Sequence, residues 1–374
     1  MRNKLISEKF QQVPLSLGGL GLGTIGIAFA WNALLSHFGL NKANKPDYDL
    51  SILIITIILA TLSLLYIIIM SIKFALNKKS IFSFLKDPRQ AGFVFPFFMA
   101  ISSFGNFLGF LNQNYFDNTF WFSIILNIIV NFATLCHVLA LIYFINVVLA
   151  KHDLDKDEVY ASWTMPLVGL GISTGFYNNL GINNKGYLTY FQILWLVCGI
   201  LFLAIFLLVG YKQYFKGHKD KNDIASMAIM ASPPNLLLVG FLVSFDPNLT
   251  QNSLIHLNAK YFQIIVYILF FFGIVGIFIY FSTLIKLLVI KQSGVAWVSL
   301  TFSSAITATS MFKIIDIFEP LGVEFGGLKN VLITIGLIMI SVGSIITSYL
   351  NVYVFVKFKT WFKYRSQVHV TGMI

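Results

Sequence analysis

A phenylalanine set among small residues is the feature of this sequence most suited to a specific chemical role. In the segment 295–315, Ser299, Phe302, Ala305 and Thr309 recur at steps of three and four residues, which places them on one face of a helix. A single bulky ring on a face of small and polar side chains could plug a narrow passage. The alternative is ordinary packing or lipid contact, because the chain contains 38 phenylalanines.

Three other segments present comparable faces of small residues and proline. The faces comprise Ser16, Gly19 and Gly23, with Gly26 and Ala30; Pro96 and Ser103, with Ala100 and Phe107; and Pro166, Gly169 and Ser173. Small residues let helix backbones approach closely in a membrane. They also leave room for a lumen between helices, so both readings, close packing and pore lining, stay open.

Charged groups are missing from the middle of these four segments. A carboxylate or histidine inside a membrane usually marks a proton relay. Among all the predicted spans, His137 in the segment 120–149 is the single candidate for such a group, and we expect it to make a structural hydrogen bond. Lys313 and Asp316 lie three residues apart near the end of their segment and are expected to pair with each other. A passage without fixed charge must select by size, dehydration cost and the field of helix ends.

The sequence offers no catalytic, metal or cofactor motif. Residues 21–26 match G-x-G-x-x-G, but the dinucleotide fingerprint needs a preceding strand, and here the match lies within an apolar run. Cys136 and Cys198 also lie in apolar runs and cannot form a metal-ligand set. We therefore expect no cofactor, no metal and no enzymatic activity.

Composition requires lipid as the solvent for most of the chain. Hydrophobic residues make up 57% of the 374 positions and charged residues 11%, against roughly 25% in a soluble domain. A helix needs about 20 mostly apolar residues to cross the hydrocarbon core. The segments that meet this requirement are 14–35, 50–74, 91–111, 120–149, 163–182, 188–211, 225–245, 261–290, 295–315 and 331–356. The sequence thus predicts an all-α membrane protein, residues 1–374 forming one transmembrane domain with short tails at 1–13 and 358–374.

Lysine and arginine predict the orientation of these spans. With a cytoplasmic N-terminus, 20 of the 26 basic residues fall in the tails and cytoplasmic loops, and only Lys42, Lys45, Lys185, Lys260 and Lys329 fall in the opposite loops. Cytoplasmic loops carry such an excess. We expect a multi-pass protein of the plasma membrane with both termini in the cytoplasm. The basic residues lie between apolar runs, so the net charge of +11 does not indicate nucleic-acid binding.

Proline distinguishes odd-numbered from even-numbered spans. Pro14, Pro96, Pro166, Pro233 and Pro234 all lie in odd spans, and the even spans contain none. Proline frees a backbone carbonyl that protein or water must satisfy in a membrane. We therefore expect five helical hairpins, in which kinked odd helices form an inner ring around a central pore and straight even helices form an outer ring.

The order of short motifs resembles the tellurite-resistance/dicarboxylate transporter family, which includes bacterial TehA and the plant guard-cell slow anion channels. The likeness lies in the segment from Pro14 through Gly19 to Trp31, in Trp163 with Pro166, Val168 and Gly169, in Ala231 with Pro233 and Pro234, and in Trp297 with Thr301 and Phe302. It extends over essentially the whole chain in span number and topology. The resemblance implies a homotrimer with one pore per protomer, and it implies that Phe302 is the phenylalanine that occludes the pore.

Two functions follow from this resemblance. The first is a channel-like pathway for small inorganic anions, gated by Phe302. The second is a proton-coupled carrier for C4-dicarboxylates or an exporter of sulfite or a tellurite-related anion, although a coupling carboxylate is missing from the spans. A membrane-embedded enzyme or receptor would need a convergent polar site, and the sequence contains none.

Overall fold

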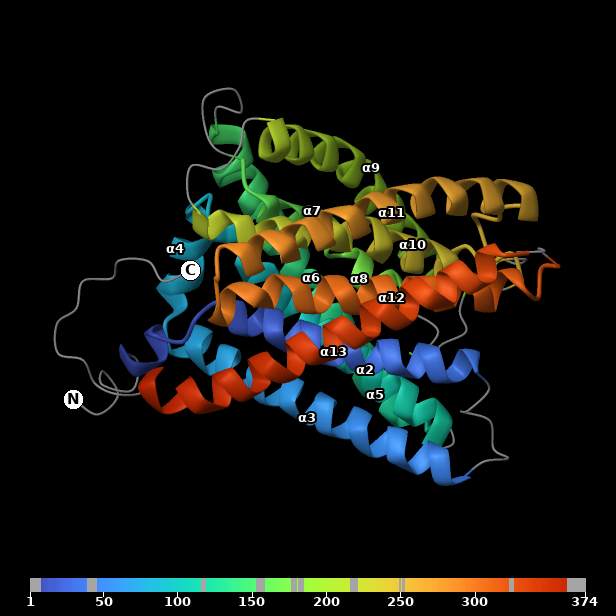
Figure 1. The fold of residues 1–374 in the computed structure, drawn as a ribbon, viewed down its shortest axis with the longest axis horizontal. Coiled ribbons are helices and arrows are strands. Elements are labelled where there is room, and N and C mark those ends of the chain that lie inside the picture. Colours follow the sequence, from blue (N-terminus) through green and yellow to red (C-terminus); the bar gives the residue numbers. More distant parts are fainter. Residues whose placement is uncertain are drawn as a thin grey trace.

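The computed structural model is entirely helical in the residues it describes, which are 8–38, 46–115, 119–152, 159–175, 180, 185–215, 221–248, 250, 253–322 and 326–361. Within these ranges, nine helices are long and apolar enough to cross a membrane, and they run roughly lengthwise in Figure 1. They are α2 (Ser16–His37), α3 (Pro46–Leu76), α5 (Phe95–Tyr115), α6 (Phe120–Val147), α9 (Lys185–Phe215), α10 (Ser232–Ser244) with the preceding 3-10 segment η5 (Lys221–Ala231), α11 (Ala259–Val289), α12 (Val298–Phe318) and α13 (Leu328–Trp361). A short α4 (Lys78–Lys86) follows α3.

The predicted fifth span, 163–182, is not a continuous helix. The chain forms η3 (Ala161–Trp163) and α7 (Thr164–Val168), turns at residues 169–170, and resumes as α8 (Gly171–Thr174). Residues 176–179 and 181–182 of the predicted span lie outside the described residues. An apolar run alone cannot reveal this break, because mostly apolar residues continue on both sides of it.

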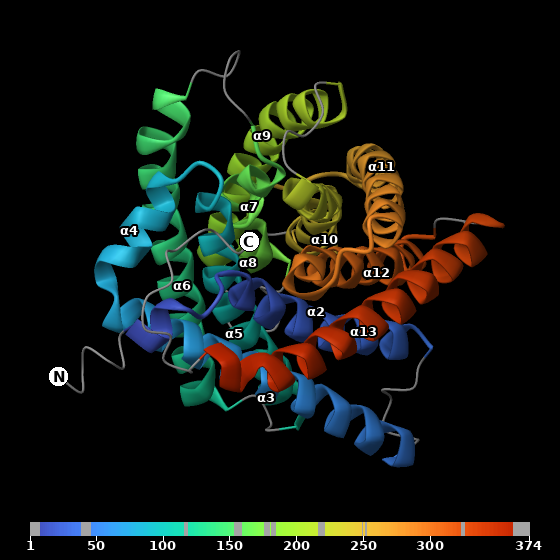
Figure 2. The ribbon, with the colours of Figure 1, turned by 60° about the vertical axis from the view of Figure 1, so that its left-hand side comes forward.

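Burial alternates along the chain. In α2, α5, α12 and the η5–α10 pair, 67–100% of the membrane-length stretch is buried, against 33–39% in α3, α6, α9, α11 and α13. Figure 2 shows α2, α5, α10 and α12 toward the middle, with the other long helices around them. The exposed side chains of the outer helices are large and apolar, as lipid contact requires.

Contacts between helices follow a regular scheme. Each buried segment packs against the long helix that follows it: α2 on α3, α5 on α6, α7 and α8 on α9, α10 on α11, and α12 on α13. The buried segments also contact one another, because α2 touches both α5 and α12, α8 touches α5 and α10, and α10 touches α12. The helices that carry the predicted functional residues are thus held together directly.

Proline lies at the start of these helices. Pro14 precedes α2, Pro96 is the second residue of α5, Pro166 lies in the first turn of α7, and Pro233 and Pro234 open α10. The 3-10 segments η1 (Ala91–Val94), η3 and η5 precede the last three of these helices. The first turn of a helix leaves its N–H groups unpaired, so proline costs little there. At Pro96, Pro166 and the pair Pro233–Pro234 the chain thus changes from 3-10 to α-helix where a kink was predicted, whereas Pro14 lies before α2 and does not kink it.

Candidate functional site

Phe302 lies on α12 at a small cavity among the buried segments. Its side chain is 6% exposed, and the cavity leaves about 10 Å³ of space for a water-sized molecule. The walls are Gly26 and Phe29 of α2, Ser103 of α5, Ile172 of α8, and Phe302, Ile306 and Thr309 of α12. Such a volume holds about one water molecule. The cavity is therefore closed to any larger solute in this conformation.

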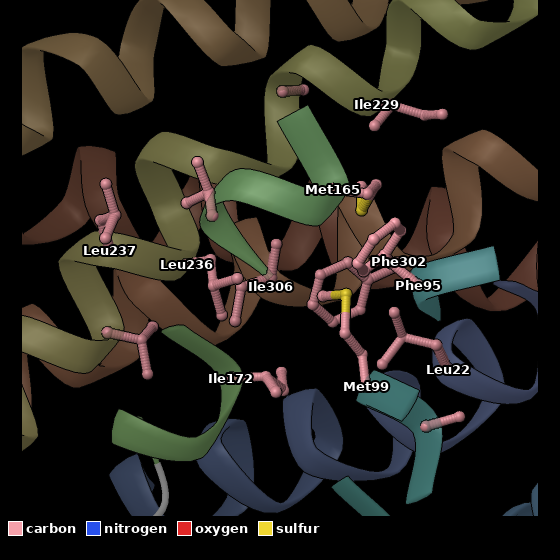
Figure 3. Close-up of a cluster of buried hydrophobic side chains, with 14 of the residues drawn as sticks. Leu22, Phe95, Met99, Met165, Ile172, Ile229, Leu236, Leu237, Phe302 and Ile306 are labelled. Carbon is pink, nitrogen blue, oxygen red and sulfur yellow. The ribbon is translucent and has the colours of Figure 1, made fainter. Parts of the chain in front are cut away.

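Flexible apolar side chains surround the ring. Figure 3 shows Phe302 in one buried cluster with Met99, Met165, Phe95 and Leu22. Methionine has three rotatable bonds and fills irregular gaps. These neighbours can therefore repack if the ring moves, at a lower cost than branched side chains would impose.

The small face of α2 is chiefly a packing surface against α12. A Cβ atom added to Gly23 would lie 1.9 Å from Thr301 Oγ1, and one added to Gly19 would lie 3.0 Å from Val298 Cγ1. A Cβ on Gly26 would lie 3.1 Å from Ala305 Cβ and 3.3 Å from Phe302 Cδ2. Close approach thus explains Gly19, Gly23 and Ala305. Gly26 in addition borders the Phe302 ring.

A polar seam joins α12 to η5 and α10. Ser299 Oγ donates to the Ala225 carbonyl at 2.6 Å, and Ser303 Oγ donates to the Ala228 carbonyl at 2.8 Å. Farther along, Asn235 Nδ2 donates to Thr307 Oγ1 at 3.0 Å. Ser299 therefore belongs to this seam. Its spacing placed it on the same helix face as Phe302, but it does not line the cavity.

The broken segment is secured by His137 of α6. Its Nε2 lies 3.1 Å from the Pro166 carbonyl oxygen, and because that oxygen can only accept, Nε2 carries the proton. A Cβ on Gly169 would lie 2.7 Å from both His137 Cε1 and Met99 Sδ. The structural hydrogen bond expected of His137 is present, and Pro166 and Gly169 form its partner surface.

Ser173 and the remaining predicted positions also hold helices together. Ser173 Oγ is hydrogen-bonded to Ser102 Oγ of α5 at 3.1 Å and to Thr134 Oγ1 of α6 at 2.9 Å. Pro234 packs against α11, where its Cγ lies 3.3 Å from the position of a Cβ on Gly276. Ser16 is the first residue of α2 and is half-buried.

Four of the residues that the sequence placed on candidate faces thus meet at the cavity: Gly26, Ser103, Phe302 and Thr309. Phe29 and Ile172 complete the wall, and sequence reasoning missed both because apolar residues are common in every span. Ile306 was missed too, although it lies one turn after Phe302.

The end of α12 differs from the expectation for its charged residues. Asp316 Oδ1 lies 3.0 Å from His37 Nδ1 at the end of α2, so Asp316 pairs with His37 and not with Lys313. Phe312 stacks on the His37 ring, with centroids 6.0 Å apart. Sequence spacing favoured the local pair because it could not show that α2 and α12 end side by side.

Comparison with known proteins agrees with this geometry. The sequence matches the family described as voltage-dependent anion channel (SLAC1) over residues 12–353, which includes all the described long helices except the end of α13. A search of curated proteins found no match. The family match extends over nearly the whole chain, as the motif resemblance predicted. The chain is therefore a multi-pass membrane protein of the SLAC1 voltage-dependent anion channel family, and it passes anions across the membrane.

Proposed function

We propose that each protomer contains its own anion pathway, surrounded by α2, α5, α7 with α8, α10 and α12, and that the outer helices shield this inner ring from lipid. The contacts among these segments, from α2 to α5, α8, α10, α12 and back to α2, support a closed ring. The cavity at Phe302 has walls from α2, α5, α8 and α12, as a central passage requires. If each inner helix forms a hairpin with the outer helix that follows it, this arrangement would explain why buried and exposed segments alternate along the chain.

Phe302 is the gate of this pathway. Its ring borders a space that holds about one water molecule, so the conformation described here is closed. The methionines beside it provide room for another rotamer at moderate cost. Opening therefore requires the ring to turn away from Gly26 and displace neighbouring side chains, without a large movement of the helices.

The pathway selects small inorganic anions by size and dehydration cost. The cavity wall contains no charged side chain, and the buried charged residues of the described chain, Lys73, Lys212 and Asp223, lie near helix ends. A proton-coupled dicarboxylate carrier is less well supported, because His137 is engaged with the Pro166 carbonyl. Selection without fixed charge suits a channel, in which binding must be weak enough for release.

The assembly and its orientation belong to the same proposal. The protein would lie in the plasma membrane with both termini cytoplasmic, as the basic loops indicate. A homotrimer would place part of the exposed apolar surface of the outer helices between protomers. Each protomer would still carry a complete pathway, because all the cavity walls come from one chain.

The test is the anion conductance of purified protein in planar lipid bilayers. Phe302→Ala removes the ring from the cavity and should raise the chloride conductance at least severalfold. Phe312→Ala is the matched control: this ring lies on the same helix, is fully buried and packs toward His37 and Gly336, away from the cavity. Equal conductance in the wild type and Phe302→Ala, with similar reconstitution, would refute the gate.

A further inference from the structure

Two buried polar side chains of α5 have no hydrogen-bond partner among the described residues. They are Ser103, through Oγ, and Asn106, through both Nδ2 and Oδ1. Their exposed fractions are 1% and 0%. Burying a polar group without a partner is unfavourable, and more so where lipid replaces water. A pair of such residues one helical turn apart therefore needs an explanation.

Neighbouring polar residues on the same helix are satisfied. Ser102 is hydrogen-bonded to Ser173, and Asn112 Nδ2 donates to Ser123 Oγ at 2.9 Å. Serine and threonine in membrane helices commonly donate to the carbonyl of the preceding turn, as Thr309 does to Ala305 at 3.0 Å. Ser103 makes no such bond. Within the buried polar residues of α5, the lack of partners is thus confined to one face, although buried polar atoms without a partner also occur on other helices of the described chain.

That face borders the cavity at Phe302. Ser103 is part of the cavity wall, and Asn106 follows it by three residues, which places both on the same side of the helix. The hydroxyl offers one donor, and the amide offers two. The other walls of the cavity are largely apolar. Ser103 thus places one unused donor in the wall that Phe302 closes, and Asn106 continues the same face of α5 by about one turn.

We propose that the Ser103 hydroxyl and the Asn106 amide bind one partly dehydrated monovalent anion of the halide class beside Phe302. The site rests on the proposed pathway and adds to it the groups that replace the water lost by the anion. Neutral donors suit this role, because conduction requires binding strong enough for entry and weak enough for exit. When Phe302 moves aside, a monatomic anion requires less widening of this space than a dicarboxylate does.

Selectivity measurements test the site in the conducting Phe302→Ala background. Ser103→Ala combined with Asn106→Leu should weaken the apparent chloride affinity, obtained from the saturation of conductance, about tenfold, equivalent to about 1.4 kcal/mol. Asn106→Asp places a negative charge beside the pathway and should lower chloride conductance about tenfold. The matched controls Ser102→Ala and Asn112→Leu remove polar groups of the same helix that already have partners, and they should leave the chloride affinity unchanged.

A direct measurement separates this inference from the gate. Crystals of the Phe302→Ala variant soaked in bromide should show an anomalous peak within hydrogen-bond distance of Ser103 Oγ and Asn106 Nδ2, and the same variant carrying Ser103→Ala and Asn106→Leu should lose it. A peak in a protein whose Phe302→Ala variant fails to conduct would support the site and overturn the gate. Water density without a bromide peak, or an unchanged chloride affinity in the double variant, would overturn the site.

Discussion

Replacement of Gly23 by alanine should separate two helices that the structure holds in direct contact. The added Cβ would lie 1.9 Å from Thr301 Oγ1 and 2.5 Å from Thr301 Cβ. The hydroxyl can rotate away, but Thr301 Cβ is fixed to the backbone, so α12 must move. The same Cβ would lie 3.2 Å from the backbone nitrogen of Phe302, so the movement reaches the proposed gate.

The size of the effect follows from two opposing contributions. Overpacking a tight interior costs about 1–3 kcal/mol, and replacing a helical glycine by alanine recovers up to about 1 kcal/mol. We therefore expect Gly23→Ala to lower the free energy of unfolding by up to about 2 kcal/mol. Gly21→Ala is the matched control two residues away, because its Cβ would meet Tyr66 Cβ at 3.4 Å, an ordinary contact. It should be neutral or stabilising by about 0.5–1 kcal/mol.

Thermal unfolding of the purified variants in one detergent measures this contrast. Gly23→Ala should melt several degrees below Gly21→Ala, while the wild type lies between them or close to Gly21→Ala. Equal melting temperatures for the two variants would refute the argument, because they share the substitution and the helix and differ only in what the new methyl group meets.

Two further predictions concern residues near the cavity. His137→Leu removes the donor to the Pro166 carbonyl and should lower stability by about 1–3 kcal/mol, whereas His137→Gln should recover part of that loss; an equal melting temperature for the two variants would contradict the assigned hydrogen bond. Ser299→Ala should lower stability by about 1 kcal/mol through the lost bond to Ala225 and leave the anion permeability ratios unchanged, and a changed ratio would place Ser299 in the pathway.

Much of the fold follows from the sequence because lipid imposes simple requirements. Apolar length located the nine continuous spans, and the contrast between spans with and without proline anticipated which ones are buried. The break after Val168 did not follow, because apolar composition continues through it. At this break, the hydrogen-bond partner of the Pro166 carbonyl is His137, which lies on a different helix, α6.

The site was harder to predict because adjacent faces of one helix serve different neighbours. Ser299 and Phe302 lie only about 60° apart around a helix with 3.6 residues per turn. Yet Ser299 donates to η5, Phe302 borders the cavity, and Ala305 contacts α2. Spacing shows which residues share one side of the helix. Which neighbour each of them contacts depends on the positions of the surrounding helices.

Thiol accessibility in the conducting Phe302→Ala background tests the central claim most directly, namely that anions pass through this cavity. Thr309 borders the cavity, whereas the next residue, Ser310, donates to Asn235 Oδ1 at 2.9 Å. With Cys136 and Cys198 replaced by serine, a small, negatively charged thiol reagent should block the anion current of Thr309→Cys and leave that of Ser310→Cys unchanged. A current that is insensitive at Thr309→Cys, or equally blocked at both positions, would show that anions take another path.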